Sequence, residues 1–171
     1  NGCNTAVGGS ALFNNTAANN TALGHSALVA NTPGEQNVAV GVSALACNTE
    51  GLENTAVGRF ALCANATGDN NTAVGKAALQ KITTNNNTAV GMETAPCTTS
   101  GYATAVGYRA MNANTTSSGS TAMGSEAMCS ITTGGNNSAF GLNALATVTS
   151  NSGNTAVGRD ALKTNTGSNN T

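Results

Sequence analysis

The sequence contains no tryptophan and very few other aromatic or charged residues. Aromatic residues make up 3% of the chain and charged residues 8%, whereas Asn, Thr, Ala and Gly supply most of its 171 positions. A conventional globular core needs bulky apolar side chains that interlock, and here they are spread too thinly. The composition argues against an ordinary globular enzyme fold, and we expect no enzymatic activity.

Strong charge and long apolar runs are also missing. Six Lys and Arg residues stand against seven Asp and Glu residues, so the formal net charge is −1. This balance provides no basic surface for nucleic acid or for an anionic membrane. No run approaches the ~20 apolar residues of a membrane-spanning helix. We therefore expect no nucleic-acid partner and no membrane insertion.

What the sequence has in abundance is a repeat. The tetrapeptide Thr-Ala-Val-Gly at 5–8 recurs with small changes, and successive copies lie 16 or 17 residues apart. Three residues after each Gly stands a second short motif, usually Ala-Leu, as at 11–12 and 44–45. The ten copies begin at Thr5, Thr21, Val38, Thr55, Thr72, Thr88, Thr104, Thr121, Ser138 and Thr155.

The period and the composition favour β structure. Sixteen or seventeen residues per repeat are too few for two helices and a turn, and Thr, Val and Asn disfavour helix. Two strands of three or four residues with two corners fit the period. We predict an all-β fold over 1–171, a single domain built as a parallel β-solenoid (β-roll) of about ten two-strand coils. Its strands are centred on the columns of Ala6 and Ala11.

The last residue falls where another copy would begin. Thr171 follows Asn169 and Asn170, and it lies 16 residues after Thr155. Neither end carries an atypical polar repeat of the kind that caps solenoids. We expect the chain to be an excerpt of a longer repetitive protein or a subunit that stacks end to end.

Residues at the same place in successive coils form columns, and each column can be assigned an environment. Strand alternation puts the Thr and Val columns on one face and the Ala column on the other. We place the Val column inside, with the Leu column of the second strand, because together they form the only substantial apolar stripe. Val38 in a Thr position agrees with this inward assignment.

The Ala column then points outward, and its uniformity needs a cause. It is Ala in all ten coils, although an unconstrained surface position would vary. Because Ala has poor strand propensity, something must exclude larger side chains, and a closely packed neighbouring chain is the simplest candidate. We predict that this column is the interface of a homo-oligomer or filament. It consists of Ala6, Ala22, Ala39, Ala56, Ala73, Ala89, Ala105, Ala122, Ala139 and Ala156.

Two further columns indicate how the backbone turns and how adjacent coils are joined. The Gly after the first strand suits a corner that needs a positive φ or a close backbone approach. The Asn that precedes the Thr either passes amide hydrogen bonds from coil to coil or is simply a favoured turn residue. This Asn column comprises Asn4, Asn20, Asn37, Asn54, Asn71, Asn87, Asn137, Asn154 and Asn170.

The Asn-Thr-Ala-Val-Gly-x-x-Ala-Leu pattern resembles the β-roll head repeats of trimeric autotransporter adhesins and similar repeats in phage tail fibres and other surface fibres. Aligned with the adhesins' Asn-Ser-Val-Ala-Ile-Gly-like motif, Ala6 matches Ala, Val7 matches Ile and Gly8 matches Gly, and the similarity covers all ten coils. The period here is longer, and Thr replaces the motif's first apolar residue. The resemblance implies an extracellular or surface-exposed, elongated, homo-oligomeric fibre used for attachment or as a surface structure.

The five cysteines show no metal-ligand spacing. Cys47 and Cys63 occupy nearly equivalent places in adjacent coils, so their Cα distance permits a disulfide, but a one-residue offset gives them opposite parity. Two interpretations stay open, a disulfide between coils and a small apolar filler. The odd count leaves at least one thiol unpaired within the chain.

Other residues of catalytic type have ordinary structural interpretations. His25, the only histidine, takes a corner position that holds Arg59 in another coil, so we interpret it as a solvated corner residue. Glu50 and Glu53 share one loop, as paired glycosidase carboxylates can, but nothing in the repeat buries them. Asp69 alone sits in a Gly-Asp-Asn loop, whereas calcium-binding coils need Asp in most repeats. We expect no catalytic residue, no metal and no cofactor.

Eight Asn-x-Ser/Thr triplets are candidate glycosylation sites, because such triplets in surface loops are the acceptors of N-glycosylation. A chain this rich in Asn and Thr also produces them by chance. The triplets begin at Asn14, Asn19, Asn65, Asn70, Asn86, Asn114, Asn136 and Asn169.

Two function classes remain. The first is an extracellular structural or adhesive fibre of stacked repeats, whose partners are other copies of itself and a cell-surface or glycan receptor. The alternative is an ice-binding β-solenoid that presents a flat, regular array of Thr to water. The Thr column discriminates between them: we assign it inward with Val, and a Thr column exposed on a flat face would favour ice binding.

Overall fold

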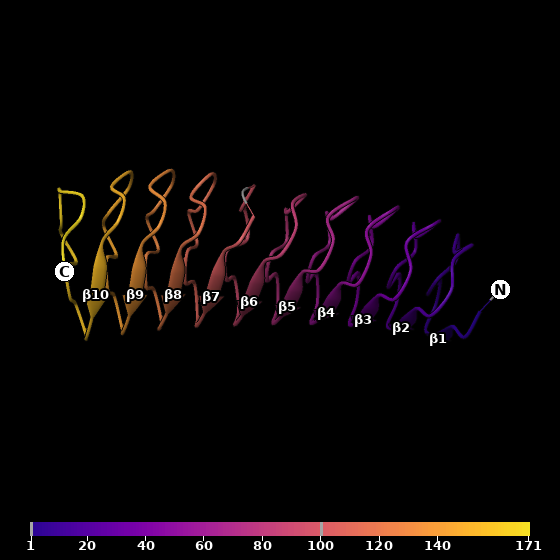
Figure 1. The fold of residues 1–171 in the computed structure, drawn as a ribbon. Coiled ribbons are helices and arrows are strands. Elements are labelled where there is room, and N and C mark those ends of the chain that lie inside the picture. Colours follow the sequence, from indigo (N-terminus) through magenta and orange to yellow (C-terminus); the bar gives the residue numbers. More distant parts are fainter. Residues whose placement is uncertain (1, 100) are drawn as a thin grey trace.

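The computed structural model describes residues 2–99 and 101–171 and shows an elongated stack of coils with the termini at opposite ends (Figure 1). One three-residue strand from each coil joins a single parallel sheet, in the order β1 to β10. The described residues contain no helix, and the prediction of an all-β parallel solenoid is confirmed. The strands are β1 Thr5–Val7, β2 Thr21–Leu23, β3 Val38–Val40, β4 Thr55–Val57, β5 Thr72–Val74, β6 Thr88–Val90, β7 Thr104–Val106, β8 Thr121–Met123, β9 Ser138–Phe140 and β10 Thr155–Val157.

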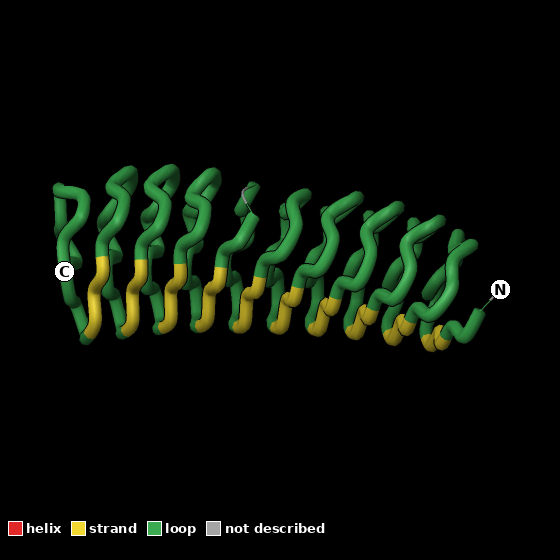
Figure 2. The backbone as a smooth tube through the Cα atoms, viewed as in Figure 1, coloured by secondary structure: helices red, strands yellow, loops and turns green. Residues whose placement is uncertain are grey.

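The second strand predicted for each coil is wrong for the described residues, because the Ala-Leu segment forms a turn (Figure 2). The residues of the Leu column have left-handed backbones, with φ of 49° at Leu45 and 50° at Leu62. A residue in this region reverses the chain direction and cannot continue a strand. Hydrogen bonds still join the turns of adjacent coils, as where the Leu45 N–H donates to the Ala61 carbonyl at 3.0 Å.

The interior is built from the Ala column and the Ala-Leu turns. Ala73 of β5 is fully buried, and Leu62 and Leu79 of the turns are fully buried in the same apolar cluster. Val74, the next residue along β5, is 36% exposed. The inward assignment of the Val column is therefore wrong: the Leu side chains fill a narrow coil, and the strand opposite them has room only for a methyl group.

The predicted oligomer interface on the Ala column is wrong for the same reason. Except at the first coil, where Ala6 is exposed, these side chains are buried within a single chain and have no surface to offer to another. What excludes larger side chains is the protein's own interior. The column comprises Ala6, Ala22, Ala39, Ala56, Ala73, Ala89, Ala105, Ala122, Ala139 and Ala156.

The glycine after each of β1 to β9 meets both conditions expected of it, and Gly158 after β10 meets the first, a positive φ. Gly24 has a φ of +139°, and a Cβ placed on it would lie 2.6 Å from the carbonyl carbon of Gly41 in the next coil. Real Cβ atoms do not approach backbone so closely. The stack therefore requires glycine at this corner, both for the backbone conformation and for the contact between coils.

The Asn column forms the coil-to-coil ladder that was one of its two interpretations. Asn37 is fully buried. Its Oδ1 accepts the backbone N–H of Asn54 at 2.9 Å, and its Nδ2 donates to the Gly51 carbonyl at 2.8 Å. Asn54 repeats the pattern one coil further on, with its Oδ1 accepting the Asn71 N–H at 3.0 Å. The ladder satisfies backbone groups that would otherwise be buried without partners.

A second buried Asn column, three residues after the Leu column, escaped the sequence analysis. Asn48 donates through Nδ2 to Asn31 Oδ1 at 2.7 Å and to the Gly51 carbonyl at 3.0 Å. Ile82 and Ile131 take the same position in other coils and are equally buried. The replacement of Asn by Ile in these coils was the signal in the sequence, because a polar and an apolar residue of similar size can share one inward position.

Candidate functional sites

The outer surface of the sheet is a face without charge, here called the Thr–Val face. It consists of the Thr and Val columns, which alternation places on the side opposite the buried Ala column. Thr72 and Thr88 are half-buried, whereas Val74, Phe140 and Leu23 are 36%, 38% and 48% exposed. The Val column comprises Val7, Leu23, Val40, Val57, Val74, Val90, Val106, Met123, Phe140 and Val157.

The Thr–Val face is regular in its middle and irregular toward both ends. Strands β4, β5, β6 and β7 all read Thr-Ala-Val, so four consecutive coils present the same outward pair. Leu23, Met123 and Phe140 replace Val in β2, β8 and β9, and Val38 replaces Thr in β3. The face therefore combines a uniform patch with side chains of several sizes.

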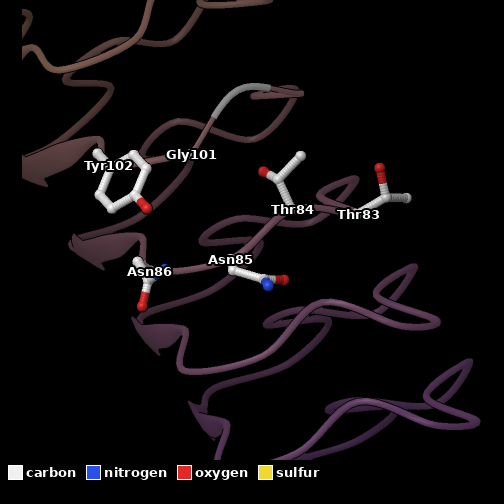
Figure 3. Close-up of a pocket in the computed structure, with 6 residues that line it drawn as sticks. All are labelled: Thr83, Thr84, Asn85, Asn86, Gly101 and Tyr102. Carbon is white, nitrogen blue, oxygen red and sulfur yellow. The ribbon is translucent and has the colours of Figure 1, made fainter.

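A second candidate site is a hollow of about 410 Å³ between the corners that precede β6 and β7, here called the corner hollow (Figure 3). One corner supplies two threonines and two asparagines, and the next supplies a glycine and a tyrosine. The tyrosine, Tyr102, is 68% exposed. The lining residues are Thr83, Thr84, Asn85, Asn86, Gly101 and Tyr102.

The corner hollow has a cause in the repeat spacing. Six positions separate Asn65 from Asn71, but only five separate Ile82 from Asn87 and five separate Thr98 from Ala103 (71 − 65, 87 − 82 and 103 − 98). Two consecutive corners are thus one residue shorter than the corner before them. Shortened corners beside a longer neighbour leave the surface indented at this place.

The two cysteines singled out from the sequence are neighbours in the structure. The Cys47 N–H donates to the Cys63 carbonyl at 3.0 Å. Partial burial raises the pKa of the Cys63 thiol, and the adjacent Cys47 thiol raises that pKa further. Both are free thiols here, and the disulfide between them stays a prediction. The other free thiols are Cys3, Cys97 and Cys129.

The residues of catalytic type do not converge on a site. His25 contacts the Ser26 hydroxyl through Nδ1 at 3.0 Å. Glu50 and Glu53 are exposed corner residues. Asp69 Oδ1 accepts the backbone N–H of Leu52 at 2.8 Å and so ties two corners together. Within 2–99 and 101–171, no group of three or more His, Cys, Asp or Glu side chains is placed to hold a metal ion.

The glycosylation triplets divide by exposure. Asn65 and Asn114 are fully buried, and their amides donate hydrogen bonds within the coil, so neither can accept a glycan in the folded chain. The other six begin at exposed asparagines, namely Asn14, Asn19, Asn70, Asn86, Asn136 and Asn169.

The chain matches no protein-family model, no curated protein and no solved structure. The resemblance to adhesin and tail-fibre repeats accordingly stays a proposal. The part of the chain that the structure describes has no long apolar helix of the kind that crosses a membrane.

Proposed function

We propose that this protein is an extracellular structural or adhesive fibre whose solenoids associate side by side through the Thr–Val face. The observation that carries the proposal is the Val column, an apolar stripe that runs along the whole sheet with seven members exposed and Val40, Val57 and Val106 half-buried. Ten strands spaced ~4.8 Å apart make it about 48 Å long. Contiguous exposed apolar surface of this extent is typical of association sites.

A second copy of the chain is the partner that the chemistry favours. Neither column of the Thr–Val face carries a charged residue, whereas Arg59, Lys76 and Arg159 stand on the corner after the Gly. Two such faces can pack together without desolvating an ion. The varied sizes of Leu23 and Phe140 suit interdigitation with a partner that varies in the same way.

The size of the face sets the strength expected of the contact. A surface about 48 Å long and ~10 Å wide offers roughly 500 Å² to each partner, below the ~800 Å² per partner of a standard interface. Association of ten coils should therefore be weak. It should strengthen as coils are added, because every coil contributes another Thr–Val pair.

Sedimentation of the protein over a range of concentrations tests the proposal. We expect the average mass to rise with concentration, and to rise further in sulfate, which strengthens apolar association. Val74→Lys should abolish this rise while leaving the melting temperature nearly unchanged, since Val74 is outward. Thr67→Lys, which adds the same charge at an exposed corner, is the matched control. A protein that stays monomeric throughout, or a Val74→Lys variant that associates normally, would contradict the proposal.

Ice binding is the second candidate, and the uniform patch of β4 to β7 favours it. In these four coils the Thr column lies on the outer face, and an outward Thr column is the arrangement expected of an ice-binding solenoid. Thermal hysteresis measured on the sedimentation samples separates the two functions. An ice-binding protein would show hysteresis as a monomer and lose it in Thr72→Lys. A fibre would show self-association without hysteresis.

A further inference from the structure

We propose that the corner hollow binds a neutral saccharide, with the Tyr102 ring stacked on the apolar face of one sugar and the neighbouring amides and hydroxyls bonded to its OH groups. The hollow lies in the corners rather than on the Thr–Val face (Figure 3). The proposal therefore goes beyond fibre formation and does not depend on it.

Tyr102 is out of place in its column. Its φ is +65°, a left-handed conformation that favours Gly and Asn and costs a bulky residue of the order of 1 kcal/mol. Most coils place Asn or Gly at this position, so the repeat does not require an aromatic here. The positive φ itself belongs to the repeat, since every member of the column shares it, so the distinguishing feature of this coil is the aromatic side chain. The other members of the column are Asn19, Gln36, Glu53, Asn70, Asn86, Gly119, Asn136, Gly153 and Asn169.

The polar groups around the hollow are uncharged, and the Asn85 amide oxygen and the Thr84 hydroxyl already accept hydrogen bonds from within the chain. Asn86 is exposed, and its side chain has no hydrogen bond to the described residues, so both ends of its amide are free for a ligand. Asn85 accepts the Asp69 N–H through Oδ1 at 2.9 Å, which fixes the side chain and leaves Nδ2 to donate. The Thr83 hydroxyl both donates and accepts.

This combination selects the class of ligand. None of the described residues that line the hollow is charged, so an anion or a cation would lose its hydration without compensation. Amides and hydroxyls match the alternating donors and acceptors of a polyol, and an aromatic ring supplies an apolar surface with a polar tip. A volume of about 410 Å³ falls in the range of small-molecule sites and accommodates a monosaccharide or a disaccharide.

Tyrosine fluorescence gives a direct assay because the chain has no tryptophan and only two tyrosines. In a Tyr108→Phe background, Tyr102 is the sole fluorophore. We would titrate this protein to millimolar concentrations with lactose, cellobiose and diacetylchitobiose, and confirm binding by saturation-transfer NMR. We expect a saturable change with at least one of these disaccharides. No saturable change with any of them would overturn the proposal.

Two variants locate the site. Tyr102→Asn installs the residue most common in the column, so it should keep or raise the melting temperature while abolishing the NMR signal. Asn86→Ala should weaken binding about tenfold through the lost hydrogen bonds. Asn70→Ala, one coil away in the same column, is the matched control and should bind normally. Saccharide binding that survives Tyr102→Asn would place the ligand elsewhere and sink the idea.

Discussion

Ala73 and Val74 are consecutive residues of β5 with opposite environments. Ala73 is fully buried, whereas Val74, the more hydrophobic of the two, is 36% exposed. The inner column is Ala in every coil, and the outer column ranges from Val to Phe140. Because interiors are close-packed, a narrow coil selects its residues by size. Between the two faces of this strand, the uniform Ala column is therefore the inward one, although the varied Val column is the more hydrophobic.

The largest effect should come from placing the same charge on either side of that strand. Ala73→Asp buries a carboxylate where there is no room and no partner, and we expect it to destabilise the middle of the stack by several kcal/mol. Val74→Asp adds a hydrated charge to the outer face and should change stability by less than ~1 kcal/mol. Urea unfolding followed by circular dichroism measures both. Similar midpoints for the two variants would show that the faces are misassigned.

A cross-link between coils tests whether Cys47 and Cys63, on adjacent corners, lie close enough together to form a disulfide. With Cys3, Cys97 and Cys129 changed to Ser, oxidised glutathione should convert the two remaining thiols to one disulfide and release two glutathione thiols. Closing a loop of one coil stabilises by about 3 kcal/mol. Non-reducing mass spectrometry and thermal melting with and without reductant measure the product and its effect. An oxidised sample that carries only mixed glutathione adducts would contradict the contact.

The Asn ladder offers a polar version of the comparison. Asn54 is buried; its Oδ1 accepts the Asn71 N–H and its Nδ2 donates to the Gly68 carbonyl. The adjacent Thr55 points outward and is half-buried. Asn54→Ala should cost about 1–3 kcal/mol, because a backbone N–H is left buried without its acceptor. Thr55→Ala should cost much less. Equal losses in thermal melts would mean that the ladder contributes nothing beyond turn preference.

The repeat period predicted the coil, the parallel stacking, the need for Gly at the corner and one use of the Asn column. It could not predict which face of the strand is inward, because alternation defines two faces without saying which one closes on the core. The prediction of a second strand failed at Leu45 and its equivalents. Leu seldom adopts a positive φ, and nothing in the sequence shows that burial compensates for the cost of this backbone conformation. The 16-residue spacings around Thr88 indicated shorter corners at the place of the corner hollow. The residues that line the hollow could be identified only from the structure, which places Tyr102 beside Asn86.

The smallest effect concerns pH, and it follows from where the ionisable groups lie. Among the described residues, the fully buried polar side chains are all Asn, Thr or Ser, so the interior has nothing to titrate.

On the outside, a hydrogen bond from Lys163 lowers the pKa of Asp160, helped by a hydrogen bond from Asn143 and by the charges of Lys163 and Arg159. A carboxyl whose folded pKa lies below its unfolded value of 3.8 stabilises the fold above that pH, and the contribution disappears as pH falls through the folded pKa. Because the Asp160 side chain lies on the surface, solvent screens these interactions and the effect is small. Melting temperatures should therefore stay nearly constant from neutral pH to about pH 4 and fall slightly below it, and Asp160→Asn should remove that slight fall. A steep acid transition that persists in Asp160→Asn would reveal an ionisable group within the fold and break the contrast between an uncharged interior and a charged exterior.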